Sequence, residues 1–244
     1  GRLSDARQIL IGSYFMFEYT PESSAVFNPS IVTPPDQSML PRGAAKTGAL
    51  RFVMSLRATG EGHISSVEFR TGIVNARGEV TVAPPSRFLA EPELTEAPKY
   101  PKGFFLRKAV AVPSDYEIQF PPDTELSERI IFPIVPIQSN GIEDVRLVAH
   151  FDAERGWVYC GTYTAYDGRN VLPQLFETTD FRRFKFITMN GPAVRNKGMA
   201  LFPRKIKGRF AMLSRQDGAD IFLMYSDDVH TWNSAERILS PRYP

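Results

Sequence analysis

The chain has 244 residues, of which 43% are hydrophobic and 23% are charged, and this composition excludes a disordered chain. Lys and Arg number 29 and Asp and Glu number 27, so the net charge of +2 argues against a nucleic-acid partner, which would need a concentrated basic surface. No apolar run approaches the roughly 18 residues of a membrane span, and we expect no membrane partner.

Short segments typical of β-strands recur along the chain in three units of similar internal order. They are rich in aromatic or β-branched residues and are bounded by Gly, Asp or Pro. The segments are 27–32, 51–57 and 63–70 in the first unit, 143–150, 157–163, 173–178 and 180–184 in the second, and 197–203, 209–215, 220–226 and 227–232 in the third. The second and third units begin at residues 143 and 197, which are 54 residues apart.

Units of three or four short strands that end in Ser or Thr, then Asp, then an aromatic residue are typical of β-propeller blades. A β-sandwich also contains many short strands, but it gives no reason for units to repeat in the same order. The 20 prolines argue against long helices, and no helical periodicity runs beyond about two turns. We therefore expect an all-β chain of the propeller type.

Closely spaced prolines between residues 84 and 140 interrupt the repeat. We expect one domain over residues 1–244, in which 84–140 is an irregular insertion or connection, with or without an outer strand. A functional lid over the mouth of the propeller is the alternative, since long proline-rich loops often carry function. Because the chain starts at Gly1 without a Met and stops at Pro244 straight after a strand-like unit, we also expect it to be truncated at both ends.

The first strand of each propeller blade lines the central channel, so the leading residues of these strands converge. They are Asn28 in the first unit, Glu143 and Asp144 in the second, and Asn196 and Lys197 in the third; Arg57, Arg146 and Arg215 lie near them in the sequence pattern. A pocket that holds both carboxylates and cations can protonate a leaving group and bind a polyhydroxylated or anionic substrate.

The three histidines and the one cysteine do not form the pattern of a metal or thiol site. His63, His150 and His230 fall in different parts of the repeat, and none has metal-ligand spacing to another ligand, so we expect no metal and no cofactor. The one cysteine, Cys160, excludes a disulfide framework and is expected to be inert core. A single thiol and the lack of a signal segment favour a cytoplasmic protein.

Several motifs, in order along the chain, resemble glycoside hydrolase family 130. Gly141-Ile-Glu-Asp-Val-Arg146 is similar to the family's Glu-Asp-Pro-Arg signature, with Val145 in place of the usual proline. Further matching stretches are 27–29, 161–168, 196–203 and 212–215. The family comprises β-mannoside phosphorylases and β-1,2-mannosidases that fold as five-bladed β-propellers, and the resemblance implies that about three to four blades are present here.

The resemblance also implies roles for individual residues. Asp144 matches the general acid that protonates the glycosidic oxygen, and Glu143 would hold sugar hydroxyls. Arg57, Lys197 and Arg215 match positions that contact phosphate or the neighbouring sugar. Asn28 and Arg146 complete the expected substrate-binding set.

The implied reaction is cleavage of a β-mannoside oligosaccharide with inversion, by phosphorolysis with inorganic phosphate or by hydrolysis. Phosphorolysis needs no protein base, whereas hydrolysis needs a carboxylate base, for which Glu61, Glu68 and Glu177 are candidates. A non-catalytic carbohydrate-binding propeller is the main alternative, and a propeller that binds proteins on its rim is a third. Whether the chain forms a homo-oligomer stays open at this point.

Overall fold

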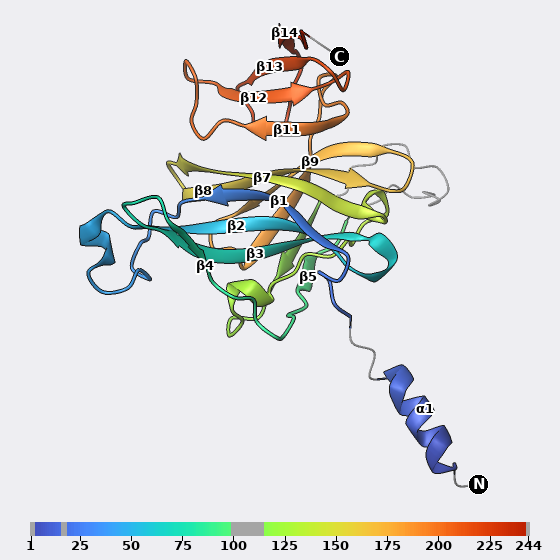
Figure 1. Ribbon diagram of the computed structural model, residues 1–244. Coiled ribbons are helices and arrows are strands. Elements are labelled where there is room, and N and C mark those ends of the chain that lie inside the picture. Colours follow the sequence, from blue (N-terminus) through green and yellow to red (C-terminus); the bar gives the residue numbers. More distant parts are fainter. Residues whose placement is uncertain (1–2, 16–18, 99–114, 243–244) are drawn as a thin grey trace.

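The computed structural model describes residues 3–15, 19–98 and 115–242 (Figure 1). Helix α1 (Asp5–Phe15) lies apart from the strands. The strands are β1 (Ala25–Val32), β2 (Leu50–Thr59), β3 (Ser65–Val74), β4 (Val80–Val82), β5 (Glu93–Glu96), β6 (Tyr116–Gln119), β7 (Gly141–Asp152), β8 (Gly156–Tyr166), β9 (Val171–Thr178), β10 (Arg183–Thr188), β11 (Lys197–Leu201), β12 (Phe210–Arg215), β13 (Ile221–Ser226) and β14 (Glu236–Leu239). Short 3-10 helices occupy Ala44–Thr47, Glu61–His63, Leu126–Glu128 and Pro136–Gln138.

The strands form three antiparallel units, each with its strands in sequence order. Unit 1 is β1-β2-β3-β4, unit 2 is β7-β8-β9-β10, and unit 3 is β11-β12-β13-β14. Strands β6 and β5 extend the outer edge of unit 2 beyond β10. Figure 1 shows unit 2 between units 1 and 3.

The chain is mostly β, as expected, and its strands fall into three antiparallel units, but segment 227–232 forms the turn after β13 and the segment at 180–184 becomes a strand only from Arg183. Two elements were not foreseen: helix α1, because its 11 residues carry only a weakly amphipathic pattern, and β14, because its four residues are all exposed and lack an apolar alternation. Within the part of the chain that the structure describes, no helix is long and apolar enough to cross a membrane.

Aspartates fix the turns between the strands. Asp152, Asp167, Asp180 and Asp217 each accept two backbone N–H groups two and three residues further on, through Oδ1. A short carboxylate side chain that satisfies the turn's own N–H groups pre-forms the turn locally. Of these four, Asp180 belongs to the Thr-Asp-aromatic pattern of the sequence, and its turn leads into β10.

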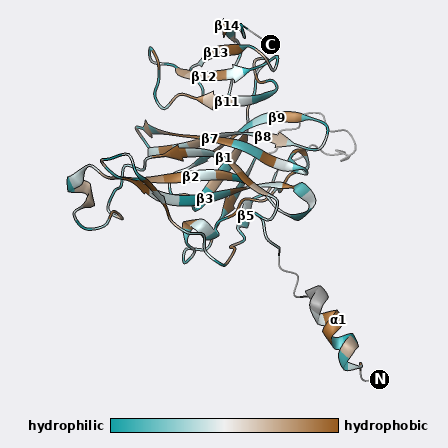
Figure 2. Cartoon of the chain, viewed as in Figure 1, coloured by the Kyte–Doolittle hydropathy of each residue, from teal (hydrophilic) through white to brown (hydrophobic). Residues whose placement is uncertain are grey.

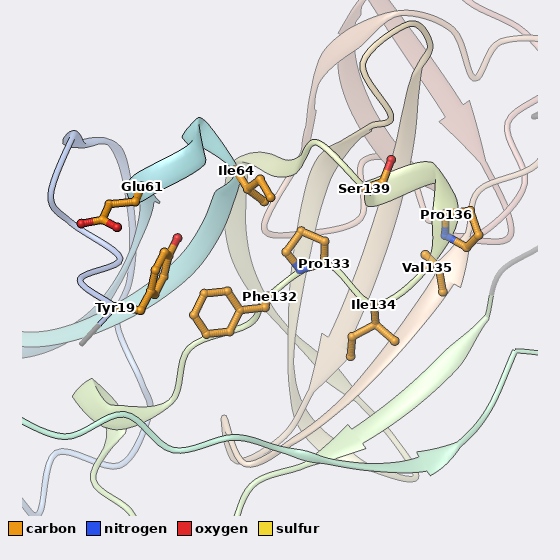
Figure 3. A pocket seen from close by; sticks show the side chains of 9 residues that line it. All are labelled: Tyr19, Glu61, Ile64, Phe132, Pro133, Ile134, Val135, Pro136 and Ser139. Carbon is orange, nitrogen blue, oxygen red and sulfur yellow. The ribbon is translucent and has the colours of Figure 1, made fainter. Parts of the chain in front are cut away.

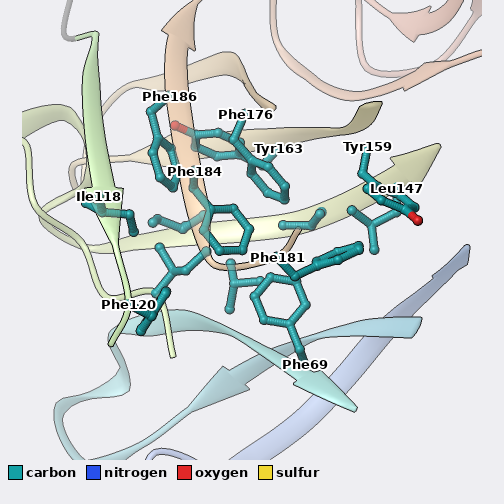
Figure 4. Packing of buried hydrophobic residues seen from close by; sticks show 14 of the residues in the cluster. Phe69, Ile118, Phe120, Leu147, Tyr159, Tyr163, Phe176, Phe181, Phe184 and Phe186 are labelled. Atoms are coloured by element: carbon teal, nitrogen blue, oxygen red, sulfur yellow. The ribbon is translucent and has the colours of Figure 1, made fainter. Parts of the chain in front are cut away.

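Two apolar clusters join the units face to face. The first lies between units 1 and 2 and is built mainly of aromatic rings, among them Phe69, Tyr163, Phe176 and Phe184 (Figure 4). Rings of Phe69 and Phe184 stack at 5.6 Å, and burying each such side chain stabilises the fold by roughly 1.5–3 kcal/mol. The second cluster lies between units 2 and 3 around methionines and the fully buried Trp232. Figure 2 shows the apolar stretches along the strands that supply these faces.

Segment 84–140 contributes to the first cluster. Strand β6 pairs with β10, and its Tyr116 and Ile118 are buried. Ile131 bridges to Val67 of β3, which fixes the stretch that leads into unit 2. Residues 99–114 of the predicted insertion lie outside the described residues.

A charge cluster around the buried Glu177 carboxylate also links units 2 and 3. The Glu177 carboxylate accepts hydrogen bonds from Arg155 at 2.6 Å and from the ring of His230, in the turn after β13, at 3.2 Å. Burial by itself would raise the pKa of Glu177, but the hydrogen bonds from His230 and Arg155 outweigh it and lower the pKa to about 2.

We predict that this cluster makes stability pH-dependent. The folded-state pKa of Glu177 lies below the unfolded value of 4.5, so its contribution is present above about pH 4.5 and is lost as the pH falls towards 2. Glu177→Gln should lower the free energy of unfolding by about 3 kcal/mol at pH 7. Urea unfolding at pH 7 and pH 3 tests this. A stability gap between the variant and the unmodified chain that is equally large at both pH values would contradict it.

Candidate active site

The first strand of every unit carries the same irregularity. The pairing register shifts between Phe27 and Ser30 in β1, between Glu143 and Arg146 in β7, and between Lys197 and Ala200 in β11. In each case one residue within the shift has a left-handed backbone conformation: Asn28 (φ 51°), Asp144 (φ 55°) and Gly198 (φ 79°). The three units therefore place a bulge at one common position, and these three residues are structural equivalents.

Asp144 and Asn28 hold this conformation at a cost, because side chains other than glycine disfavour it by about 1–3 kcal/mol. Such strain is concentrated at functional sites. The equivalent of Asp144 in unit 3 is Gly198, not the predicted Asn196, which lies two residues earlier and also has a positive φ of 60°.

Arg57 of β2 joins the bulges of units 1 and 2. Its guanidinium donates to Glu143 Oε1 at 2.7 Å and to Asp144 Oδ1 at 3.2 Å. The Asn28 amide donates to the same Asp144 oxygen at 2.5 Å. The structure thus brings together Asn28, Arg57, Glu143 and Asp144, four of the predicted site residues, which lie up to 116 positions apart in the sequence.

The exposure of these groups suits a site that is open to a ligand. Glu143 is buried, whereas the side chains of Arg57 and Asp144 are 18% and 26% exposed. Because Asp144 Oδ1 accepts both hydrogen bonds, its Oδ2 is free of hydrogen bonds to the described residues. The carboxyl group is therefore anchored at one oxygen, and the other has no hydrogen-bond partner among the described residues.

Two further residues hold Arg57 in place. Its guanidinium carbon lies 4.8 Å from the centroid of the Phe27 ring, in a cation–π contact, and its Nε donates to Ser65 Oγ at 2.9 Å. Ser65 forms the single parallel pairing between units 1 and 2, with Gly141. A Cβ on Gly141, whose φ is 146°, would lie 2.8 Å from Ser65 Cβ, so glycine permits this close contact.

The other predicted residues lie at the bulges of units 2 and 3. Arg146 donates weakly to the Pro29 carbonyl at 3.4 Å. Lys197 and Arg215 face each other across β11 and β12, and Arg215 packs over Gly198. Lys197 and Arg215 occupy the positions in unit 3 that Phe27 and Arg57 occupy in unit 1, and neither forms an ion pair with a described residue.

Two of the three proposed bases lie elsewhere. Glu68 points to the side of β3 opposite Val67, away from unit 2, and shares Arg70 with Glu22. Burial, and then Glu22, raise the pKa of Glu68 to about 8 against the effect of Arg70. Glu177 lies at the far end of unit 2 in the cluster described above. Only Glu61, in the loop between β2 and β3, lies at the same end of the units as Asp144.

Cys160, His150 and His230 lie away from this centre, and His63 lies beside Glu61 in the loop between β2 and β3. The Cys160 thiol is buried, which raises its pKa, and it lies 3.7 Å from His150 Nδ1, whose pKa burial lowers. Over residues 3–15, 19–98 and 115–242, no group of three His, Cys, Asp or Glu side chains is placed to hold a metal ion.

Sequence reasoning missed Phe27 and Ser65 as neighbours of Arg57. Phe27 belongs to the motif at 27–29, but the motif does not show that its ring contacts Arg57. Ser65 carries no sequence signal, because its role depends on the contact between units 1 and 2. A signal for Phe27 exists in the repeat. Aligning the three first strands at their bulges places Phe27 at the same position as Glu143 and Lys197, which were both predicted site residues.

Comparison with known proteins connects this geometry to a family. No family model matches the chain. Over 119 residues the chain is 32% identical to a 1,2-beta-oligomannan phosphorylase of Thermoanaerobacter sp. (strain X514). The motif resemblance to glycoside hydrolase family 130 is confirmed. This match covers 43% of the chain and 37% of the phosphorylase.

Solved structures agree with the resemblance at the level of the fold. One, from work on glycoside hydrolases of the GH130 family that target beta-1,2 mannosidic linkages in Candida mannan, has a TM-score of 0.50 at 15% identity. The aligned region covers 92% of this chain and 54% of the chain in that structure. A glycosyl hydrolase from Bacteroides ovatus also has a TM-score of 0.50, at 14% identity, with 91% and 53% covered. The chain thus spans about half the length of these two structures.

We predict that Arg57 and Glu143 stabilise the fold as a pair. Arg57→Met should lower the free energy of unfolding by about 3 kcal/mol, because it leaves the buried Glu143 carboxylate without its cation. Adding Glu143→Gln to that variant should restore part of the loss. Urea unfolding of both single variants and the double variant tests this as a double-mutant cycle. Strictly additive losses would contradict it.

Proposed function

We propose that the protein is a β-mannoside phosphorylase that cleaves β-1,2-linked oligosaccharides, with the three units forming blades of a five-bladed propeller. The observation that carries this proposal is the contact of Arg57 and Asn28 with Asp144 at the bulges of units 1 and 2, together with Lys197 and Arg215 at the equivalent bulge of unit 3. This arrangement combines one available acid with an anion-binding pair. The similarity to a 1,2-beta-oligomannan phosphorylase supports the choice of substrate.

Asp144 is the proposed general acid. Its Oδ1 is fixed by Asn28 and Arg57, so Oδ2 carries the proton that passes to the glycosidic oxygen, directly or through a hydroxyl of the bound mannose. Glu143 is engaged by Arg57 and is buried, which favours a role in holding sugar hydroxyls over a role as a base.

Lys197 and Arg215 are the proposed phosphate ligands. Both side chains are exposed, face each other across β11 and β12 and have no carboxylate partner among the described residues, so an anion from solvent can reach the two cations together. Phosphate is already anionic at neutral pH and needs positioning rather than deprotonation. It attacks C1 from the face opposite the leaving oxygen, so the product has the inverted α configuration.

Hydrolysis is a second candidate, favoured by one observation. Glu61 is an exposed carboxylate at the same end of the units as Asp144, and a carboxylate there can activate water. The two reactions differ in product. With phosphate present, phosphorolysis yields mannose 1-phosphate, whereas hydrolysis yields free mannose with or without phosphate.

We predict that Asp144→Asn lowers kcat for β-1,2-mannobiose by at least 10²-fold, because an amide cannot supply the proton. Asp123→Asn, which alters an exposed aspartate in the turn after β6, is the matched control and should be fully active. Thermal unfolding of both variants verifies that the fold is intact. Undiminished turnover by a folded Asp144→Asn variant would overturn the assignment.

We predict that Lys197→Ala and Arg215→Ala each raise the KM for phosphate about tenfold or more, because each removes one cation from the anion site. Lys207→Ala, in the hairpin at the other end of unit 3, should leave this KM unchanged. Initial rates at varied phosphate and saturating mannobiose measure the effect. An unchanged KM for phosphate in both variants would exclude Lys197 and Arg215 as its ligands.

A further inference from the structure

A groove of about 500 Å³ lies between units 1 and 2 (Figure 3). One wall is formed by Tyr19, Glu61 and Ile64, and the other by residues 132–136 and Ser139. Its volume falls within the roughly 300–1,000 Å³ typical of small-molecule sites. Of the residues named in the two candidate reactions, only Glu61, the base considered for hydrolysis, lines it.

Residues that line the groove are sequence neighbours of residues at the candidate active site. Ile64 directly precedes Ser65, and Ser139 comes two residues before Gly141. Ser65 and Gly141 are paired, and Ser65 accepts the hydrogen bond from Arg57. The groove therefore begins next to the junction that positions Arg57 against Asp144.

The lining combines aromatic faces with hydrogen-bonding groups. The rings of Tyr19 and Phe132 meet edge to face at 5.9 Å, and both side chains are half-buried. Glu61 adds an exposed carboxylate and Ser139 a hydroxyl. Burial, then Glu61 and Glu68, raise the pKa of the Tyr19 phenol, so it remains a hydrogen-bond donor. Aromatic faces pack against the C–H faces of sugars, and acceptors and donors beside them bind hydroxyls.

The position of Tyr19 depends on Gly60. A Cβ at Gly60 would overlap the Tyr19 ring, so only glycine allows the ring to lie against this loop. The ring is thereby fixed by backbone contacts in the free protein, and a ligand need not order it.

We propose that this groove binds the sugar on the leaving-group side of the scissile bond and stacks it on Tyr19 and Phe132. The inference rests on the proposed function. In an inverting reaction the nucleophile and the leaving group lie on opposite sides of C1. Ile64 of the groove adjoins Ser65, which binds the Arg57 side chain that contacts Asp144, so the groove lies next to the proposed acid, which gives its proton to the leaving oxygen.

The test compares β-1,2-mannobiose with β-mannosyl fluoride, whose leaving group is fluoride and contains no sugar. Phe132→Leu and Tyr19→Leu should lower kcat/KM for mannobiose about tenfold, mainly through KM, and leave turnover of the fluoride unchanged. Phe88→Leu, at an aromatic side chain that is 73% exposed and outside the groove, is the matched control and should affect neither substrate.

Equal losses on both substrates, or no loss on mannobiose, would overturn the inference. Calorimetric titration of mannobiose into the same variants tests sugar binding by the groove separately from the proposed function. If the unmodified protein turns over neither substrate, the proposed function fails. Binding of mannobiose that weakens about tenfold in Phe132→Leu and stays unchanged in Phe88→Leu would still support the groove, and unchanged binding in both would refute it.

Discussion

The site depends on one guanidinium that bridges two units. Arg57 comes from unit 1, and the two carboxylates that it binds, Glu143 and Asp144, come from unit 2. Neither unit contains the site alone, so the packing of the aromatic cluster between them sets the geometry of the chemistry. The contact between Ser65 and Gly141 fixes the spacing of the two units at the point where Arg57 crosses. Loss of this spacing would separate the acid from the cation that anchors it.

The β-bulge in the first strand of each unit carries a different residue. The same bulge carries Asn28 in unit 1, Asp144 in unit 2 and Gly198 in unit 3. The first donates a hydrogen bond, the second is the proposed acid, and the third leaves room for Arg215. The left-handed positions of units 1 and 2 thus bring the proposed acid and a hydrogen-bond donor to it into contact, and the equivalent position of unit 3 lies beside Arg215.

The order of the units and the identity of Asn28, Arg57, Glu143 and Asp144 could be predicted from the sequence, because the repeat and the motifs are local patterns. The contacts of Ser65 and Phe27 could not, since they arise from residues that meet only after two units pack. For the same reason the sequence did not separate Glu61 from Glu68 and Glu177. Only the register of β3 shows that Glu68 faces away from unit 2, and only the packing of unit 3 shows that Glu177 binds His230.

The proposed reaction has Asp144 protonating the leaving oxygen on one face of the sugar while phosphate attacks C1 from the other face. The anomeric configuration of the first product formed from β-1,2-mannobiose in phosphate buffer, followed by proton NMR, tests it most directly. The account predicts α-mannose 1-phosphate as the first product. Appearance of the β anomer would contradict it, because that outcome requires a covalent intermediate and a nucleophile on the same side as Asp144.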